Sequence, residues 1–467
     1  MEKRLMTTLA LSFMFLATLS GCSKKGLPPF EMPENGYDGS EVTITFYHAM
    51  GQDLQGKLNT YIEKFSKIHP NIIINEQYVG NYDAVRDQLV NEIAIGEGSN
   101  VAYCYPDHVA LYNKANKVVT LDQFINDTKE YSYVDSEGNT ISYTFGLTDE
   151  QKNDFVEPYY NEGKTYGDGL VYSLPFAKST EVLYYNDTFF KEHNLSVPTT
   201  WDEMWSLCRE IKKIDSNCIP LGYDSDSNLF ITMCEQLGTG YTSDDSNEHF
   251  IFNNDKNKAW LKELKGYYDE GLFITKGLSG TYTSSLFTAA AKQGEQCCYM
   301  CIGSSAGASY QNPDKDSEGN YPFNVEIAPI PQHDVNNPKA IQQGPSICLF
   351  NNKDPQQVCA SWLFMKFLCT SKEMQADMSK INGYTPILKS VSDIPVYAKW
   401  ISDGKDIQAK ATKVCIETRD SNFISPSFVG SSKARDQVGD ALDAILSGTE
   451  TIDEALQKAY DECVYSS

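Results

Sequence analysis

Basic residues are scarce in this sequence. It has 39 Lys and Arg against 63 Asp and Glu in 467 residues, a formal net charge of −24. A chain this acidic repels phosphate backbones, so we expect no nucleic-acid partner, and an anionic ligand needs a local cationic group. Beyond residue 22 there is no apolar run of the ~20 residues that a membrane-spanning helix needs.

Histidine is also scarce, with six in the chain, and this bears on one enzymatic interpretation, a serine hydrolase. Gly303-Ser304-Ser305-Ala306-Gly307 spells the G-x-S-x-G pattern of a serine hydrolase nucleophile. That chemistry needs an acid and a histidine further on, and the only later histidine is His333, which follows closely. We therefore expect no enzyme and keep a serine hydrolase as a remote alternative that an esterase assay would test.

The cysteines lack the spacing of a metal site or of a disulfide framework. Cys297-Cys298-x-x-Cys301 is the one tight cluster, and it has no second pair and no nearby histidine. Thiols such as Cys359 and Cys369 stand in apolar surroundings, so most of the 13 cysteines are expected to be buried and free. We expect no metal and no cofactor.

What is present begins with the N-terminus. A charged start is followed by an apolar run, Leu5 to Leu19, which is too short to span a bilayer and suits a signal peptide. Leu19-Ser20-Gly21-Cys22 resembles the lipobox of bacterial lipoproteins. The resemblance implies a signal peptide over residues 1–22, acylation of Cys22 and an extracytoplasmic protein anchored to the membrane by lipid. An ordinary secretory signal is the alternative. The breaker-rich residues 23–40 predict a flexible tether.

The next segments alternate between strand and helix patterns. Residues 42–46, 72–74 and 101–105 predict strands, and periodic apolar residues over 54–68 and 85–93 predict helices. This alternation indicates a largely parallel α/β sheet. The remaining ~445 residues predict two or three domains.

Later segments are read in the same way. Residues 126–170 are polar, rich in tyrosine and without a strong period, and they indicate an insertion. A capping box is predicted at Thr200 with Glu203, and caps are predicted at Thr370 with Glu373 and at Thr451 with Glu454. Helices are predicted from Asp354-Pro355 through Leu368, and from Arg435 to a stop at Gly448.

From Val42 onward the chain resembles the extracellular solute-binding proteins of ABC transporters, in the maltose-binding-like group. The resemblance rests on Leu174-Pro175-Phe176 before Leu183-Tyr184-Tyr185-Asn186, on Pro198 to Glu203 and on Gly383-Tyr384-Thr385-Pro386. It implies an α/β, two-lobed periplasmic-binding-protein type II fold with a cleft between the lobes and several hinge crossings. We expect one lobe from 41–180 and 330–383, and the other from 181–329 and 384–467. The implied partner is an ABC permease, and we expect a monomer.

Within that family the chain most resembles the members that bind glycerol 3-phosphate. Tyr47-His48-Ala49-Met50, Gly80-Asn81-Tyr82 and the run Arg435 to Gly448 carry this resemblance. The ligand-binding positions it implies are Tyr82, Ser179, Ser304, Gly344, Tyr384 and Arg435, with Asp107 for a glutamate of the family. The chain departs from the pattern at Cys297-Cys298 and in the longer insertion.

The same residues fit a small phosphorylated polyol, glycerol 3-phosphate or a glycerophosphodiester. Arg435 offers a planar fork for phosphate oxygens, and we expect it in the first turn of a helix whose Gly430-Ser431-Ser432 start presents free N–H groups. Ser179, Ser304 and Gly344 would add neutral donors, and Tyr82 and Tyr384 a ring face and a hydroxyl. Trp201 suits stacking on ligand carbons and core packing equally. If Arg435 faces solvent, a neutral mono- or oligosaccharide is the alternative ligand. An inert adhesin or scaffold is a further alternative.

Overall fold

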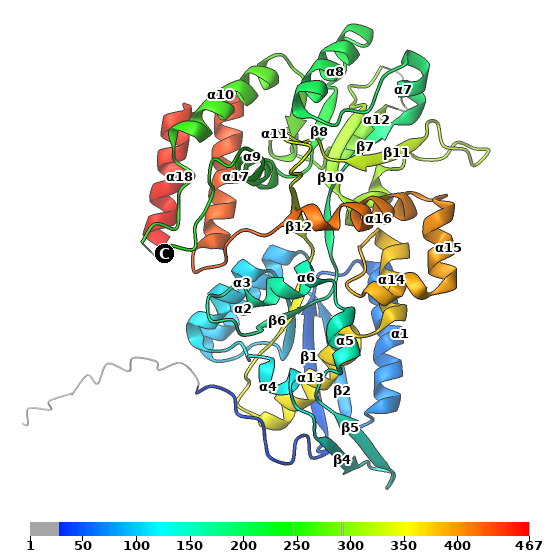
Figure 1. Ribbon diagram of the computed structural model, residues 1–467, viewed down its shortest axis with the longest axis vertical. Coiled ribbons are helices and arrows are strands. Elements are labelled where there is room, and N and C mark those ends of the chain that lie inside the picture. The colour runs from blue at the N-terminus through cyan, green and yellow to red at the C-terminus, as the bar shows by residue number, and fades with distance from the viewer. Residues whose placement is uncertain (1–27, 246, 291, 293, 467) are drawn as a thin grey trace, which may run out of the picture.

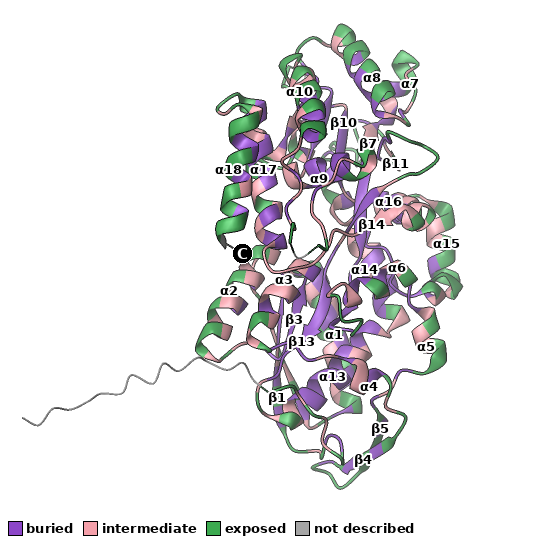
Figure 2. Cartoon of the chain, turned by 60° about the vertical axis from the view of Figure 1, so that its left-hand side comes forward, coloured by how far each residue is buried: buried purple, intermediate pink, exposed green. Residues whose placement is uncertain are grey.

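The chain forms two lobes, each built around its own β-sheet (Figure 1). The computed structural model describes residues 28–466 apart from 246, 291 and 293. The predicted signal peptide and the predicted lipidation site Cys22 lie outside these described residues. The interior of each lobe is a continuous apolar core, and Figure 2 shows the buried strands enclosed by helices whose outer faces are exposed.

The sheet of the first lobe has the strand order β2-β1-β3-β13-β6. Its strands are β1 (Val42–His48), β2 (Ile72–Tyr78), β3 (Val101–Cys104), β6 (Ser173–Pro175) and β13 (Ser346–Leu349). β1 pairs in parallel with β2 and β3, which confirms the predicted β-α-β-α-β unit, while β13 joins antiparallel from far along the chain. The helices of this lobe are α1 (Gln52–Ile68), α2 (Tyr82–Ile95), α3 (Pro106–Tyr112), α4 (Asp122–Ile125), α13 (Pro355–Cys369) and α14 (Lys372–Asn382).

Helix α1 shows how the sequence forms these elements. Leu54, Leu58, Tyr61 and Phe65 recur at helical spacing and are buried against the sheet. The helix ends before Pro70, which has no N–H to continue the ladder. The predicted helix and its stop are confirmed.

The inserted segment 126–170 is more ordered than its composition indicated. It contains a hairpin of β4 (Glu130–Val134) and β5 (Thr140–Thr144), then α5 (Asp149–Asp154), α6 (Glu157–Asn161) and the 3-10 turn η2 (Glu162–Lys164). Aromatic rings on one face of the hairpin pack beside Tyr37, which is fully buried. The Tyr37 amide also donates to the Tyr143 hydroxyl at 2.6 Å.

The structure of residues 28–40 differs from one expectation. A flexible tether was predicted over residues 23–40, but the described part packs on the first lobe: Phe30 stacks on Phe124 at 5.5 Å, and the Met32 amide donates to Gln123. The sequence of this segment is rich in breakers, yet its few apolar side chains bury enough surface to hold it in place.

The sheet of the second lobe has the order β14-β12-β7-β10-β8-β9, with β11 also paired to β7. Its strands are β7 (Ser179–Asn186), β8 (Leu221–Tyr223), β9 (Phe273–Thr275), β10 (Met300–Ser304), β11 (Val325–Pro329), β12 (Ala340–Gln343) and β14 (Asn422–Phe423). The helices of this lobe are α7 (Asp187–His193), α8 (Trp201–Ile214), α9 (Asp226–Leu237), α10 (Asp255–Asp269), α11 (Lys276–Ser279), α12 (Ser284–Ala289), α17 (Ser431–Ser447) and α18 (Ile452–Ser466). Figure 1 shows α17 and α18 side by side at one edge of this lobe, next to α9 and α10.

The chain passes between the lobes at three places. β6 leads into β7 through residues 176–178, and β12 leads into β13 through residues 344–345. The third passage runs from α14 through α15 (Pro395–Asp403) and α16 (Ile407–Thr418) to β14. The predicted lobe limits remain a prediction. The sheets themselves divide the chain so that β12 belongs with the second lobe, while Ile387 and Tyr397 join the core of the first.

The predicted helix starts are mostly confirmed. Thr200 and Glu203 form the expected capping box of α8, and Thr451 exchanges hydrogen bonds with Glu454 before α18. One start is shifted, because Ser371 rather than Thr370 caps α14, with its hydroxyl accepting from the Met374 amide. Both residues have a capping hydroxyl, and the pattern alone did not separate them.

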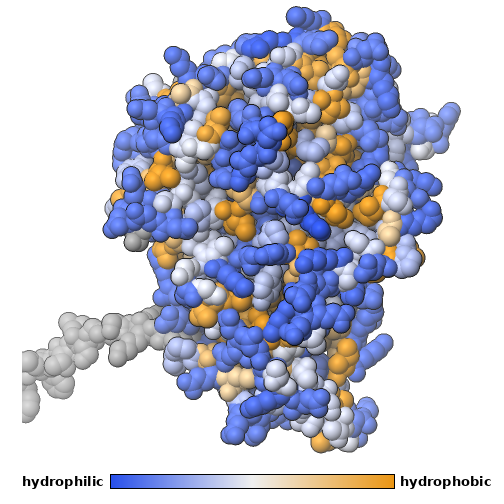
Figure 3. Space-filling view, viewed as in Figure 1, coloured by the Kyte–Doolittle hydropathy of each residue, from blue (hydrophilic) through white to orange (hydrophobic). Residues whose placement is uncertain are grey.

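The surface is mostly hydrophilic, with apolar side chains in separate patches on the face shown in Figure 3. Within the described ranges, no helix combines the length and the apolar character that crossing a bilayer requires.

Candidate functional site at the lobe junction

Arg435 lies on α17, and its side chain reaches α9 of the second lobe. The helix begins at Ser431 after Gly430, whose φ of 107° belongs to the left-handed region that favours glycine. Arg435 is therefore in the second turn, not in the first turn as predicted. One Nη of its half-buried guanidinium donates to Oδ1 of Asn228, on α9.

The start of α17 also differs from the expectation. The Ser431 amide donates to the Phe428 carbonyl at 3.1 Å, and the Ser432 hydroxyl accepts from Arg86 at 3.0 Å. The predicted row of free N–H groups is thus wrong for Ser431, because the chain turns back on itself just before the helix.

Beneath Arg435 lies a buried carboxyl group that the sequence interpretation missed. Both oxygens of Glu181 accept hydrogen bonds, at 2.6 Å from the Tyr223 hydroxyl and at 2.9 Å from Nδ2 of Asn228. Burial raises the pKa of Glu181 to about 7, against the lowering effect of these two donors. The strand pattern held the signal, since Ser179 and Glu181 are two residues apart on β7 and so share a face.

Two of the predicted serines meet beside this group. The Ser304 hydroxyl at the end of β10 donates to the Ser179 hydroxyl at 3.2 Å. β10 and β7 are antiparallel neighbours, and Ser304 stands opposite Glu181 in their register. The structure therefore brings Ser179 and Ser304 together, and both lie next to Glu181.

Two predicted tyrosines meet at the first lobe. The hydroxyls of Tyr82 and Tyr384 are 3.1 Å apart. Tyr82 opens α2, and its ring stacks with Tyr103 and lies edge-on to Tyr105. Burial raises the pKa of both hydroxyls of the pair, so they are neutral donors and acceptors at physiological pH.

Asp107 and Arg435 act on the same groups from opposite lobes. Burial raises the pKa of the Tyr105 hydroxyl, while the positive charge of Arg435 opposes the rise and Asp107 adds to it. Burial also lowers the pKa of His108, with Arg435 again lowering it and Asp107 opposing. These groups belong to the first lobe, since Tyr105 follows β3 and Asp107 and His108 lie on α3. The charge of Arg435 on the second lobe therefore influences this part of the first lobe.

Arg86 connects the two lobes directly. Its guanidinium, on α2, lies 3.2 Å from Asp83 and 2.8 Å from Asp87 on the same helix. It also donates to the Ser432 hydroxyl and lies 3.7 Å from Asp436, both on α17. The side chain is only 15% exposed, although it is charged. Because α2 and α17 belong to different lobes, the contacts of Arg86 with Ser432 and Asp436 require the two lobes to lie as they do in this structure.

Gly344 lies in the passage between β12 and β13. Its φ is +88°, and a Cβ there would lie 1.9 Å from the Ala177 carbonyl oxygen in the neighbouring passage. Its own carbonyl accepts from Nζ of Lys178 at 2.9 Å. Lys178 also pairs with Glu162 of η2, and both are buried. The two passages are thus tied together beside Ser179.

Trp201 lies apart from the other predicted residues. It is 1% exposed in the core of the second lobe, where its ring stacks on Trp205 and its Nε1 donates to Gln236 at 2.9 Å. The structure therefore places Trp201 in the core position that the sequence left open, and places the other predicted residues around the junction.

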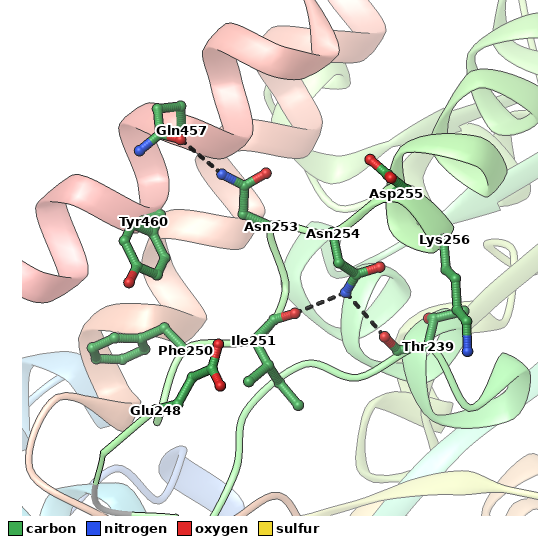
Figure 4. A pocket seen from close by; sticks show the side chains of 10 residues that line it. All are labelled: Thr239, Glu248, Phe250, Ile251, Asn253, Asn254, Asp255, Lys256, Gln457 and Tyr460. Atoms are coloured by element: carbon green, nitrogen blue, oxygen red, sulfur yellow. Dashed lines mark hydrogen bonds between the residues drawn. The ribbon is translucent and has the colours of Figure 1, made fainter.

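A cavity of about 590 Å³ opens elsewhere in the second lobe, between the 239–256 segment and α18 (Figure 4). None of the predicted residues lines it. Nδ2 of Asn254 donates to the Thr239 and Ile251 carbonyls and Nδ2 of Asn253 donates to Gln457, while the buried Oδ1 of Asn253 has no hydrogen-bond partner among the described residues. Convergent charge and buried donors are found at the junction, which is therefore the candidate site.

The other chemical groups fit the predictions unevenly. The twelve cysteines of the described residues are all free and buried, as predicted. In the same residues no three metal-ligating side chains come together. Ser305, the serine of the G-x-S-x-G pattern, is buried beside Gly383. His333, the histidine considered as its partner, lies beside Trp201 instead.

The comparisons with known proteins define the class. The family model described as bacterial extracellular solute-binding protein matches residues 60–407. The chain belongs to this family of solute-binding proteins of ABC importers, and the predicted family is confirmed.

Individual relatives narrow the comparison. The sn-glycerol-3-phosphate-binding periplasmic protein of Pectobacterium atrosepticum is 25% identical over 90% of this chain and 89% of that protein. The corresponding protein of Escherichia coli K12 is 24% identical over 90% of this chain and 91% of that one.

Solved structures confirm the predicted two-lobed fold. The Mycobacterium tuberculosis UgpB in complex with glycerophosphocholine superposes with a TM-score of 0.71, at 14% identity, over 91% of this chain and 98% of that one. A Listeria monocytogenes binding protein in complex with cycloalternan has a TM-score of 0.70, at 17% identity, over 91% and 99%.

Proposed function

We propose that this protein captures a small phosphorylated polyol, glycerol 3-phosphate or a glycerophosphodiester, outside the cytoplasm and delivers it to an ABC permease. It acts as a monomeric binding protein and not as an enzyme, anchored by lipid on Cys22. The ligand would lie between Arg435 on the second lobe and the Tyr82–Tyr384 pair on the first. Ser179, Ser304 and the Gly344 amide would bind its neutral oxygens, and Asp107 would lie at the edge.

The observation that carries the proposal is the way Arg435 is held. Among the described residues it forms no salt bridge, and its recorded partner is the neutral amide of Asn228. Arg86, by contrast, has three carboxylate neighbours. A partly buried guanidinium without a carboxylate partner is available to an anion, and its planar fork suits phosphate.

The relatives support the phosphate. Two of them carry glycerol 3-phosphate in their names, and a structure with the same fold was solved with glycerophosphocholine. The proposed mechanism is closure of the lobes by small rotations in the three passages, which buries the ligand's charge against Arg435. Burying a phosphate is favourable only when its charge and hydrogen bonds are matched. An unphosphorylated sugar would leave the charge of Arg435 unmatched, so the site would reject it.

A neutral sugar or polyol is the second candidate. Solved structures of the same fold hold cycloalternan and ribitol, and the Tyr82 and Tyr384 rings offer the flat apolar faces that sugars require. The two candidates differ in their need for Arg435.

Calorimetry of the purified protein with glycerol 3-phosphate, glycerophosphocholine, glycerol and maltose tests the proposal. We expect binding of the two phosphate compounds with dissociation constants near the micromolar range. Arg435→Ala should abolish that binding with little change in melting temperature. Binding of maltose, or unchanged phosphate affinity in Arg435→Ala, would refute the proposal. Cys22→Ser should separately release the protein from the membrane fraction.

A further inference from the structure

Glu181 is an unusual carboxyl group, because it is buried near the start of β7, close to the passage between the lobes. It is 2% exposed, and its two hydrogen-bond donors, Tyr223 and Asn228, are both neutral. A buried carboxylate is normally paired with a cation or shifted toward its neutral form. Among the described residues, Glu181 has no direct cationic partner. Arg435 is connected to it through Asn228, which hydrogen-bonds both residues.

The side-chain amide of Asn228 links Glu181 to Arg435 by hydrogen bonds at its two ends. A carboxamide has a donor end and an acceptor end. Glu181 takes the donor end, so the acceptor end must face α17, where it receives the Arg435 guanidinium. If the amide turned over, its NH₂ group would face Arg435, two donors would meet, and Glu181 would lose a hydrogen bond. Glu181 therefore fixes where Arg435 is held, without touching it.

The charged and titratable groups facing Glu181 are few. Tyr223 and Asp224 face it from the end of β8, Asn228 from α9 and Arg435 from α17, and Ser304 stands opposite it on β10. Asp224 opposes ionisation of Glu181, but its own carboxylate accepts from the amide and hydroxyl of Thr283 at 2.6 and 2.8 Å. Arg435 is thus the one cation in this group that favours the charged form of Glu181.

We infer that Glu181 and Asn228 position Arg435 for its ligand and that Glu181 takes up a proton when an anion binds there. The inference deepens the proposed function and rests on it.

The sign follows from electrostatics. Without a ligand, the Glu181 carboxylate is favoured by Arg435. An anion at Arg435 offsets that positive charge and adds its own repulsion, so the protonated form of Glu181 becomes favoured. The pKa of Glu181 is already about 7, so a modest further rise changes its charge near neutral pH. By linkage, affinity for the anion must increase as pH falls through this range.

Calorimetry with glycerophosphocholine is the test, because a phosphodiester has no group that titrates near pH 7, unlike a monoester with a pKa near 6. Titrations in two buffers of different ionisation enthalpy give the number of protons taken up. We expect the wild type to take up a fraction of a proton at about pH 7 and its affinity to rise about three- to tenfold between about pH 8.5 and 6. This corresponds to a rise of roughly half to one unit in the pKa of Glu181.

Glu181→Gln is the matched variant, since its amide oxygen accepts from Asn228 and it has no charge to titrate. In this variant the proton uptake that Glu181 contributes should be absent, and only uptake by other groups such as His108 should remain. The affinity for glycerophosphocholine should be nearly constant across this pH range. Tyr223→Phe removes a donor from the carboxylate, so proton uptake should move to higher pH.

The outcomes separate the two proposals. Equal proton uptake in wild type and Glu181→Gln, with binding intact, overturns this inference and leaves the proposed function standing. No binding of glycerophosphocholine or glycerol 3-phosphate by the wild type overturns both. If Glu181→Gln does not fold, the pH at which Tyr223→Phe takes up its proton decides: an unchanged profile overturns the inference.

Discussion

The Tyr82 and Tyr384 hydroxyls lie 3.1 Å apart although 302 residues separate them in the chain. Tyr82 stands at the first position of α2, and Tyr384 follows Gly383 at the end of α14. One hydroxyl donates to the other, so the pair has one hydrogen left to offer elsewhere. This contact brings two predicted ligand positions together at one point of the first lobe.

Breaking the pair should cost stability in a recognisable way. Tyr82→Phe or Tyr384→Phe leaves one buried hydroxyl without its partner, so we expect each to lower the unfolding free energy by about 1 kcal/mol. The double variant leaves no hydroxyl unpaired and should lose less than the sum. Urea denaturation measures all three. Strictly additive losses would mean that the two hydroxyls do not interact.

Gly344 should tolerate no side chain. Gly344→Ala combines a left-handed φ of +88° with a Cβ 1.9 Å from a backbone oxygen, which cannot move as a flexible side chain would. Gly138, in the β4–β5 turn, has a matching φ of +87° with nothing within 4 Å of the added Cβ. Gly138→Ala should therefore cost about 1 kcal/mol, from backbone strain alone.

Gly344→Ala should lose clearly more unfolding free energy than Gly138→Ala in the same denaturation experiment, because the two lobe passages would be forced apart. Similar losses would indicate that the passage between β12 and β13 can shift without penalty.

Trp201 separates core packing from ligand contact. Because it is buried between Trp205 and Gln236, Trp201→Phe should lower the unfolding free energy by roughly 1–3 kcal/mol through the lost volume and hydrogen bond. Ligand affinity, measured by calorimetry on the folded variant, should stay within about twofold. A large loss of affinity at unchanged stability would return Trp201 to the ligand site.

The sequence predicted local elements well because their causes are local. The apolar periodicity of α1 and the capping pair Thr200 and Glu203 are set within a few residues, and both are confirmed. Residues 28–40 were misjudged for the opposite reason. Their order depends on Tyr37 entering a core formed by the hairpin that begins some 90 residues later, and no local pattern records that contact.

The site shows the same division. The family pattern placed Arg435 and the serines near one another, but the partner that holds Arg435 was invisible. Asn228 lies on a different helix, and Glu181 is the third residue of β7, between Thr180 and Val182. The face that Glu181 shares with Ser179 on β7 pointed to it, but its hydrogen bonds with Tyr223 and Asn228 join residues far apart in the sequence and are seen only in the structure.

Arg86 should bias the lobes toward the arrangement seen here. Its contacts with Ser432 and Asp436 exist only while α2 and α17 are close, so they stabilise this arrangement and no other. Arg86→Met keeps much of the side-chain volume and removes the charge. We expect it to raise the radius of gyration of the unliganded protein in X-ray scattering, and to weaken ligand binding about two- to fivefold, as a partly exposed ion pair allows.

Arg209 is the matched control. It pairs with Glu270 at 2.6 Å inside the second lobe, so Arg209→Met removes an equivalent charge without touching the junction. Its radius of gyration and affinity should match the wild type. Without ligand, high salt should raise the radius of gyration of the wild type toward that of Arg86→Met and leave that variant nearly unchanged, because screening acts on the contact the variant already lacks. Identical behaviour of the two arginine variants would show that the Arg86 contact does not influence lobe closure.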